Sequence, residues 1–474
     1  MERVKQLVNK LLVMKFGGTS VGSAERMRAA CGLIAAEAAK RPVVAVVSAM
    51  SKITDLLLDT TRHAEGGDQA GVDQSLQQLE ARHIAAVKDL VGPEDRERVE
   101  CAVRNLIAEF RRIANGMLML AYRPPRAVDE AIAIGERLSA LLISERLQSI
   151  GVAAEAVNAA GVIVTDAVFN NASPVMTATK EKAQARLTPA LEHGITPIVT
   201  GFNGATADGR PTTLGRGGSD FSASILAAAL EASDLWIWTD VDGIMTADPR
   251  LVPDARILDE ITYSEAAELA YAGAKVLHPR TLAPLVERGI PVWSKNSFAP
   301  EKPGTRIVPA LGADNPGARA VTSMSNVALV SLEPASAEVG GVHIMARSLD
   351  ALDRAHVEIL AVSSSSYRQS FCFLVRKDEL ERATEALESA LALELAHGYV
   401  HEIEADTNVG LLAVVGEGMR GFSGLAGRIF TAISRENVNI IAIAQGSSEL
   451  TISIVVRREG LEKAVRAVHA ECHL

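Results

Sequence analysis

Two glycine-containing segments, far apart in the chain, combine the residue types that bind phosphate. The first is Met14-Lys-Phe-Gly-Gly-Thr-Ser20, and the second is Thr212-Thr-Leu-Gly-Arg-Gly-Gly-Ser-Asp220. Small residues let backbone N–H groups close around an anion, and a lysine or arginine supplies counter-charge. Two such loops in one chain predict chemistry on a phosphorylated substrate.

The first loop follows an apolar run and precedes a helical one, so it is expected between a strand and a helix. Lys15 is the natural cation for a phosphoryl group in transfer. Gly17 and Gly18 permit close backbone approach, while Thr19 and Ser20 add hydroxyl donors. A lysine before two glycines also occurs in plain turns, but its place after a buried strand favours a site.

In the second loop, Asp220 is expected at the start of a helix. As a cap it would satisfy backbone N–H groups, and as a site residue it would orient Lys15 or hold Mg²⁺. The two roles are compatible. Arg216 lies between glycines, and its planar guanidinium suits a carboxylate bound through two hydrogen bonds.

A third segment, 238–250, follows another predicted strand and is rich in Asp and Gly. Ligands of open α/β sheets bind at the carboxyl ends of strands, so Thr239 and Asp240 are expected to hold a nucleoside. Asp248-Pro-Arg250 is equally compatible with a turn. Lys275 is either a phosphate contact or a surface lysine. No Gly-x-Gly-x-x-Gly follows a predicted strand, which argues against a dinucleotide site.

Composition narrows the class of protein. The 474 residues are too many for one ordinary core. The excess of 58 acidic over 48 basic residues argues against nucleic-acid or anionic-membrane partners. No apolar run has the length of a membrane helix, and the first ten residues are unlike a secretion signal. Four scattered cysteines predict reduced thiols in a cytoplasmic protein.

The first two-thirds of the chain predict an α/β domain over 11–308, with a mostly parallel sheet between helices. Helical, polar sequence over about 53–116 predicts an inserted lobe. Predicted strands are Leu11–Phe16, Val43–Ser48, Ala153–Asn158, Pro197–Thr200, Leu235–Thr239 and Pro291–Ser294. Predicted helices are Ala24–Lys40, Ala131–Gln148, Ala178–Glu192 and Ser219–Ala232.

After a predicted linker over 309–326, the sequence repeats itself. Residues 357–375 align without gaps to 438–456, an offset of 81 residues, and Gly340 and Arg347 fall on Gly421 and Arg428. Each copy predicts strand, helix, strand, turn, strand and helix, a small α+β module. We place the modules at 325–400 and 401–474. Tandem modules after a catalytic domain predict regulation; duplication for stability alone is the alternative.

Together these segments resemble the aspartokinases, which have the amino-acid kinase fold. The tandem repeat resembles their paired ACT modules, which are ferredoxin-like. The matching segments, in the family's order, are Lys15–Ser20, Gly135–Ser139, Gly201–Gly204, Thr213–Asp220, Thr239–Gly243 and Lys275–Pro279. The resemblance covers almost the whole chain.

The resemblance implies ATP-dependent phosphorylation of the L-aspartate side chain to 4-phospho-L-aspartate, the entry to lysine, threonine and methionine synthesis. Mg²⁺ is expected to arrive with ATP, without fixed protein ligands. The implied phosphoryl-transfer residues are Lys15 and Asp220. The implied aspartate-binding residues are Ser48, Glu136 (for the α-amino group), Phe202, Arg216 (for a carboxylate) and Ser219. The implied ATP contacts are Lys15, Gly17, Gly18, Thr19, Ser20, Thr239, Asp240, Arg250 and Lys275.

The enzyme is also expected to be regulated by an amino acid. A homodimer formed through the ACT region is expected as well. The predicted effector residues are Gly421, Asn437, Asn439 and Gln445; the alternative is that these segments only form a turn and a strand cap. Gln445 and the turn that follows it resemble the corresponding segment of threonine-sensitive aspartokinases. Threonine is therefore expected as the effector in preference to lysine. Ser364 stands at the equivalent position of the first repeat. Because the chain ends at Leu474, no dehydrogenase domain is expected.

The chemistry fits a carboxylate acceptor, because a carboxylate is already ionised at neutral pH and needs no general base. A hydroxyl acceptor usually requires one. Two rival interpretations stay open: a sister kinase acting on glutamate, carbamate or a nucleoside monophosphate, and a catalytically silent amino-acid sensor. The joint presence of Lys15, Asp220 and Arg216 argues against the sensor.

Overall fold

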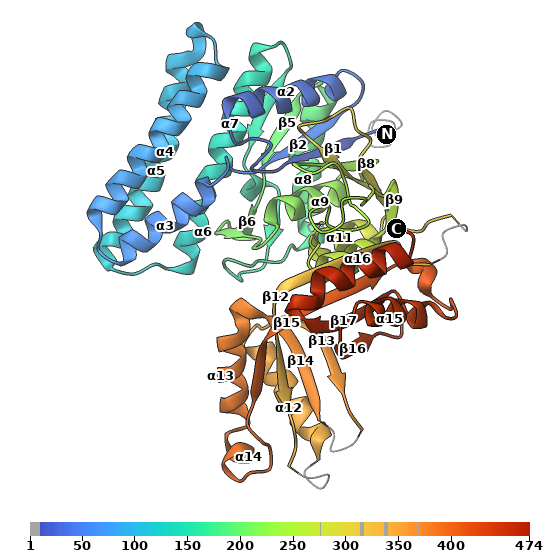
Figure 1. Cartoon of the computed structure of the whole chain (residues 1–474). Coiled ribbons are helices and arrows are strands. Elements are labelled where there is room, and N and C mark those ends of the chain that lie inside the picture. The colour runs from blue at the N-terminus through green and yellow to red at the C-terminus, as the bar shows by residue number, and fades with distance from the viewer. Residues whose placement is uncertain (1–9, 275, 313–316, 336–339, 367–369) are drawn as a thin grey trace. The chain divides into compact units, whose positions relative to one another are not determined.

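The computed structural model describes residues 10–274, 276–312, 317–335, 340–366 and 370–474 (Figure 1). It divides into two compact units. Unit 1 comprises 1–244, 259–261 and 277–309, and unit 2 comprises 245–258, 262–276 and 310–474. Among the helices of these described ranges, none combines the length and apolar character that crossing a membrane requires.

Unit 1 is built on an eight-stranded sheet with the order β3-β5-β2-β1-β8-β10-β11-β9. The strands from β3 to β10 are parallel, and β11 pairs antiparallel with β10. This confirms the prediction of a mostly parallel sheet. The strands are β1 Leu12–Phe16, β2 Val43–Val47, β3 Ala154–Val157, β5 Thr196–Thr200, β8 Asp234–Thr239, β9 Glu260–Thr262, β10 Val292–Asn296 and β11 Thr305–Val308.

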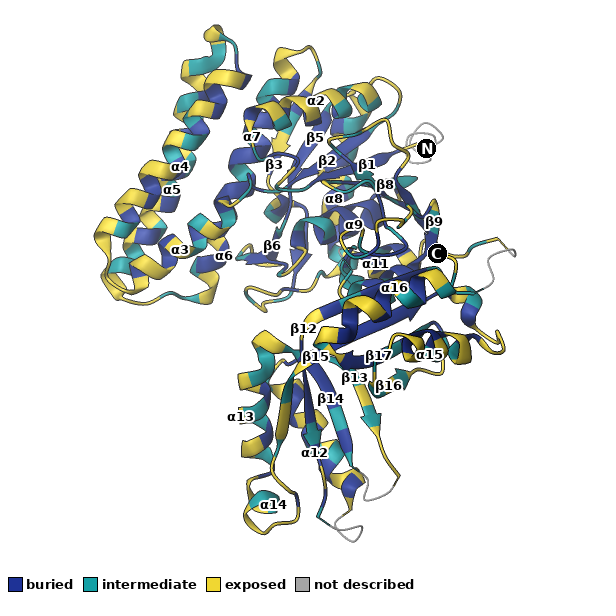
Figure 2. Cartoon of the chain, in the orientation of Figure 1, coloured by how far each residue is buried: buried dark blue, intermediate teal, exposed yellow. Residues whose placement is uncertain are grey.

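Helices cover both faces of this sheet (Figure 1). On one face, α2 (Ala24–Ala38) and α7 (Ile134–Ser149) pack against Leu12, Met14 and Phe16 of β1. Successive strand residues point to opposite faces, so Lys15 is directed to the other side. There it meets α9 (Gly218–Ala229), which α8 (Met176–Glu192) and α11 (Pro279–Val286) flank. Strand alternation therefore sets the direction of the lysine. Figure 2 shows how completely the central strands are buried.

The predicted helical insert is present as three consecutive helices that pack on one another through apolar side chains including Leu57, Leu79 and Phe110. They are α3 Ile53–Glu65, α4 Gln69–Leu90 and α5 Pro93–Leu120, and α6 Pro125–Ile132 follows. A three-stranded sheet completes unit 1, formed by β4 Val164–Thr165, β6 Asn203–Thr206 and β7 Pro211–Thr213. Its strand β7 leads directly into the second glycine loop.

Unit 2 contains one antiparallel six-stranded sheet with the order β13-β14-β12-β15-β17-β16. This confirms the predicted α+β architecture. The strands are β12 Ala320–Leu332, β13 Ile359–Ser364, β14 Phe371–Arg376, β15 Glu404–Val415, β16 Ile440–Gln445 and β17 Thr451–Arg457. The helices are α10 Tyr263–Tyr271, α12 Gly341–Arg354, α13 Leu380–Ala390, α14 Ala392–Ala396, α15 Leu425–Arg435 and α16 Leu461–Glu471.

The internal repeat is visible in the elements of unit 2. Strands β13 and β16, and helices α13 and α16, have the same lengths and are offset by the 81 residues of the sequence repeat. The paired arginines act alike, since Arg347 donates to the carbonyl of Ala390 and Arg428 to that of Glu471, at the ends of the equivalent helices. The element pattern of the repeat is confirmed, whereas the module boundaries stay predictions.

The predicted linker over 309–326 is wrong at its C-terminal end, because β12 already begins at Ala320. Residues from Ala320 to Met324 pair in register with β15, from Val415 to Leu411. The small and polar residues of this stretch resemble a linker in composition. Backbone pairing with β15 nevertheless makes them a strand.

Candidate active site

An open pocket of about 470 Å³ in unit 1 collects most of the predicted acceptor and phosphate residues. It lies beyond the carboxyl ends of β1 and β2, where the loops after these strands meet the start of α9. Lys15 and Arg216 line the same pocket, as the prediction of a shared cationic site requires. The lining residues are Lys15, Gly18, Ser48, Ala49, Met50, Ser51, Lys52, Thr54, Asp55, Glu136, Phe202, Gly215, Arg216, Gly217, Gly218, Ser219 and Asp220.

Lys15 and Asp220 form an ion pair at the inner wall of this pocket. Lys15 Nζ lies 2.5 Å from Asp220 Oδ1, and the two side chains are 10% and 22% exposed. Parallel pairing with β2 and β8 fixes the backbone of Lys15, and Asp220 sits in the first turn of α9. A Cβ at Gly17 would stand 3.3 Å from Nζ of Lys15, so this glycine leaves room beside the ammonium. The lysine is thus held in place by charge and by backbone.

The second glycine loop bends sharply on both sides of Arg216. Gly215 and Gly217 have φ of 73° and 68°, in the left-handed region that favours glycine. A Cβ at Gly218 would lie 2.5 Å from Cδ2 of Phe202, so only glycine fits there without movement. The Arg216 side chain is exposed and makes no ion pair with any residue that the structure describes. It is therefore available to an anion in the pocket.

Glu136 lines the pocket with a buried carboxyl group. The residue is 3% exposed, and its Oε1 accepts the N–H of Ala49 at 3.1 Å, while its Oε2 has no hydrogen-bond partner among the described residues. Burial raises the pKa of Glu136 to about 8. A Cβ at Gly135 would lie 2.8 Å from Cβ of Ala49, so this glycine lets α7 approach closely. The free oxygen suits an ammonium group on a ligand.

Phe202 completes the wall in an unusual backbone conformation, with φ of 71°. Its N–H donates to the hydroxyl of Ser222 at 2.9 Å, and its carbonyl accepts the N–H of Leu214 at 2.9 Å. These bonds join the end of β5 to the second glycine loop. The predicted pocket residues Ser48 and Ser219 lie in the lining beside it.

Four polar or charged residues that the sequence analysis did not select also line the pocket: Ser51, Lys52, Thr54 and Asp55. They follow β2 and begin α3, just as the first glycine loop follows β1. The Ser51 hydroxyl donates to the carbonyl of Gly18 at 2.8 Å, which joins the two loops. The available signal was their position directly after a buried parallel strand, where ligands bind.

Most of the predicted nucleotide contacts lie outside the pocket lining. The N–H of Gly17 donates to the carbonyl of Trp238 at 3.3 Å, so the loops after β1 and β8 are neighbours. Ser20 is 2% exposed, and its hydroxyl bonds to the carbonyl of Trp238 and to the hydroxyl of Ser297. Thr19 is exposed, and Thr239 donates to Asp240 at 3.2 Å. The two predicted ATP segments are thus adjacent to each other.

Arg250 belongs to unit 2. Arg250 pairs with Asp248 at 2.5 Å, and its side chain is 79% exposed at a turn, as in the alternative interpretation of this segment. Lys275 lies outside the described residues. The proposed ATP role of both residues stays a prediction.

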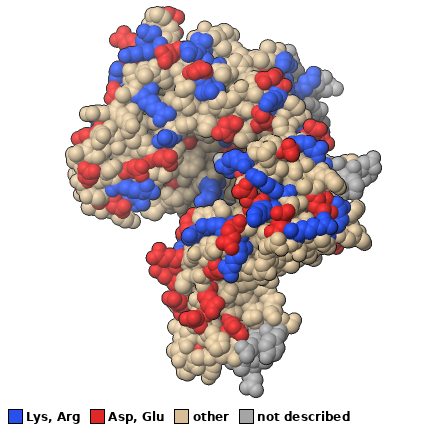
Figure 3. All heavy atoms as spheres, viewed as in Figure 1, with Lys and Arg blue, Asp and Glu red and all other residues tan. Residues whose placement is uncertain are grey.

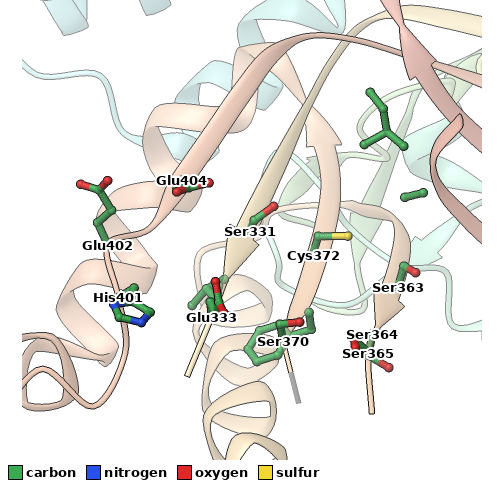
Figure 4. Close-up of a pocket in the computed structure, with 14 residues that line it drawn as sticks. Ser331, Glu333, Ser363, Ser364, Ser365, Ser370, Cys372, His401, Glu402 and Glu404 are labelled. Carbon is green, nitrogen blue, oxygen red and sulfur yellow. The ribbon is translucent and has the colours of Figure 1, made fainter. Parts of the chain in front are cut away.

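Unit 2 has a cavity of its own, about 350 Å³ in volume, on the sheet (Figure 4). Ser363, Cys372, Ser331 and Glu404 are directly opposite one another on β13, β14, β12 and β15, so they form a row across four strands. Further acidic residues line the cavity, including Glu402. Serine hydroxyls and carboxylates together suit a ligand with a cationic amine.

The predicted effector residues do not line the cavity of Figure 4. Gly421 donates its N–H to Glu449 at 2.8 Å, Asn437 has φ of 54°, and Gln445 ends β16. Their role in binding an effector remains a prediction. On the face in Figure 3, acidic side chains gather over the part of unit 2 that holds α13, which exposes Glu381, Glu385 and Glu388.

Comparison with known proteins decides the family. The model of the amino acid kinase family matches residues 10–296, and an ACT domain model matches 412–472. The aspartokinase of Schizosaccharomyces pombe is 30% identical over 493 residues, covering 97% of this chain and 92% of the yeast protein. The chain belongs to the aspartokinases, within the amino acid kinase family.

Other aspartokinases are similar to this chain in sequence and in structure. The bifunctional aspartokinase/homoserine dehydrogenase 1 of Arabidopsis thaliana chloroplasts is 33% identical over 470 residues, covering 98% of this chain and 51% of the plant protein. This chain thus spans about half the length of the curated bifunctional relatives it matches. Escherichia coli aspartokinase III, solved with aspartate and ADP, has a TM-score of 0.81 at 31% identity, covering 98% of this chain and all of the bacterial one. Its complex with lysine and aspartate has a TM-score of 0.80 at 31% identity, with the same coverage.

Proposed function

We propose that this chain is an aspartate kinase, which transfers the γ-phosphoryl group of ATP to the side-chain carboxylate of L-aspartate. The observation that carries this proposal is the unpartnered, buried Oε2 of Glu136, a residue that lines the same pocket as Arg216 and the Lys15–Asp220 pair. An amino acid offers one ammonium and one or more carboxylates to such a pocket. The E. coli relative with aspartate and ADP supports this choice of substrates.

In this proposal, Glu136 binds the α-ammonium group and Arg216 a carboxylate, and these contacts orient the acceptor. A side-chain carboxylate oxygen forms the new bond to phosphorus while the bond from phosphorus to the ADP oxygen breaks. The products are 4-phospho-L-aspartate and ADP, and no proton has to move because the acceptor is already ionised. Lys15 stabilises charge on the transferring group, and Asp220 keeps the ammonium in position.

ATP is proposed to bind at the adjoining loops after β1 and β8, through the backbone of Gly17 and Gly18, the hydroxyl of Thr19, and Thr239 with Asp240. Ser20 is proposed to support this site from within, because its buried hydroxyl bonds to Trp238 and Ser297. Mg²⁺ is proposed to enter with the nucleotide and would supply counter-charge to its phosphates. The neighbouring positions of Gly17 and Trp238 support one continuous nucleotide surface. The product would supply lysine, threonine and methionine synthesis, and the proposed location is cytoplasmic.

We also propose that unit 2 makes the enzyme responsive to an amino-acid end product. The ACT match and the lysine complex of the E. coli relative support this regulation. The cavity in Figure 4 offers carboxylates for an effector amine, in addition to the predicted positions at Gly421, Asn437, Asn439 and Gln445. A homodimer through the ACT region is proposed as well. Titrating threonine and lysine into the activity assay tests the regulation, and the molecular mass of the protein in solution tests the dimer. An activity that responds to neither amino acid would reject simple end-product control.

The experiment that tests the main proposal measures ADP release by the full chain with ATP, Mg²⁺ and one acceptor at a time. L-Aspartate should support turnover, whereas L-glutamate, carbamate and nucleoside monophosphates should not. Turnover with one of those acceptors would favour a sister kinase. Amino-acid binding without ADP release would favour a silent sensor.

A further inference from the structure

Lys52 stands at a position where a lysine is unfavourable for the fold. It has φ of 63° and ψ of 4°, in the left-handed region that residues with a Cβ rarely adopt. It is also the N-cap of α3 and makes no side-chain capping bond, where Ser, Thr, Asp or Asn would be favoured. Its positive charge lies at the positive end of the helix dipole. Local rules broken together at one residue indicate a functional constraint.

The side chain of Lys52 lines the candidate active site and is exposed to it. It makes no ion pair within the part of the chain that the structure describes. The neighbouring lining residues Thr54 and Asp55 lie in the first turn of α3. This long cationic side chain in the pocket lining is thus available to a ligand.

The charges of the pocket show what this cation contributes. Lys15 is neutralised by Asp220 at 2.5 Å. Burial raises the pKa of Glu136 to about 8, and any negative charge on its carboxyl would be balanced by the acceptor's own ammonium group. Among the remaining lining residues, Arg216 and Lys52 are cationic and Asp55 is anionic. Without Lys52 the pocket is close to neutral, whereas the proposed acceptor is an anion that must approach the polyanion ATP.

We propose that Lys52 is a further substrate-binding residue, which attracts and holds a carboxylate of the acceptor beside Arg216. This inference rests on the proposed function, since it assigns Lys52 to the acceptor half of that site. Because Lys52 strains the backbone but helps to bind the acceptor, replacing it should keep or raise the stability of the protein and weaken its use of aspartate.

The test compares Lys52→Gly, which suits the left-handed backbone, with Lys52→Arg, which keeps the charge. Lys182→Gln removes an exposed lysine charge on α8 and is the matched control. For each full-length variant, Tm, kcat and the KM values for aspartate and ATP are measured. Lys52→Gly should equal or exceed the wild-type Tm while its aspartate KM rises roughly fivefold or more. Lys52→Arg should keep an aspartate KM close to that of the wild type, and Lys182→Gln should match the wild type in all four quantities.

An unchanged aspartate KM in Lys52→Gly would overturn the inference, as would a rise confined to the ATP KM. A lower Tm together with a general loss of kcat would show that Lys52 is structural. These outcomes leave the proposed function intact if the wild type releases ADP with aspartate. A wild type that lacks this activity would end both proposals.

Discussion

The ammonium of Lys15, at the end of β1, lies 2.5 Å from the carboxylate of Asp220 in the first turn of α9. The pair joins two glycine loops that are far apart in the sequence and places both at one pocket. Because each charge is held by its neighbour, the lysine is positioned before substrates arrive. Such preorganisation is the main source of catalysis in phosphoryl transfer.

Replacing Lys15 with alanine should therefore abolish most of the turnover. We expect kcat to fall at least about a hundredfold, since a preorganised charge on the transferring group is lost. The fold should persist, as judged by circular dichroism and Tm. Lys180 lies on α8, and Lys180→Ala, which breaks its exposed pair with Glu231, is the control and should keep wild-type rates. Near-normal steady-state turnover in Lys15→Ala would refute the assignment of this residue.

Replacing Arg216 with alanine should damage the use of aspartate in particular. Loss of a charged hydrogen-bonding partner should raise the aspartate KM by roughly ten- to a hundredfold and leave the ATP KM nearly unchanged. Arg210→Ala removes a nearby arginine that pairs with Asp208, and it should have no such effect. A change limited to the ATP KM would contradict the acceptor role of Arg216.

Glu136→Gln should remove a pH-dependent cost to stability and, at the same time, impair the binding of aspartate. The folded-state pKa of Glu136 is raised from 4.5 to about 8, so the folded protein holds a proton that the unfolded chain releases. Wild-type stability should therefore decline, relative to Glu136→Gln, as pH rises from about 4.5 to about 8. Aspartate use should be impaired in the variant, because a neutral amide cannot form an ion pair with the ammonium group. Thermal melts of both proteins between pH 5 and 8.5 check the first point, and parallel curves would refute it.

Gly135→Ala tests the close approach that positions Glu136. The new methyl group would lie 2.8 Å from Cβ of Ala49 and 3.2 Å from Cγ2 of Ile53. We expect a loss of about 1–3 kcal/mol in the free energy of unfolding and weaker aspartate binding. Gly116→Ala is the control, because its Cβ meets nothing within 4 Å inside α5, and it should gain about 0.5–1 kcal/mol. Chemical denaturation measures both changes, and an equal change in the free energy of unfolding for Gly135→Ala and Gly116→Ala would contradict the packing argument.

The residues best predicted from sequence are those whose local pattern carries the chemistry. Lys15 lies near the end of a buried strand and shortly before two glycines, and Asp220 closes a glycine loop, so each could be selected by type and spacing. That they pair depends on α9 packing on the face of β1 to which Lys15 points, which is a tertiary contact that the local sequence does not specify. The duplicated modules were also visible, because an offset of 81 residues is preserved in both strand and helix positions.

What the sequence did not reveal depends on three-dimensional context. Lys52 is an ordinary lysine in sequence, and only its left-handed backbone and its place in the pocket single it out. Ser20 carries a hydroxyl as predicted, yet that hydroxyl is buried against the carbonyl of Trp238. The start of β12 was missed because its pairing with β15 is non-local.

The most direct test of the central claim identifies the bond that the enzyme makes. A phosphorylated carboxylate is an acyl phosphate, which hydroxylamine converts to a hydroxamate, whereas a phosphate ester does not react in this way. With the full chain, ATP, Mg²⁺, L-aspartate and hydroxylamine, we predict aspartyl hydroxamate in amounts equal to the ADP released, and none with Lys15→Ala. ADP release from the wild type without any hydroxamate would contradict a carboxylate acceptor.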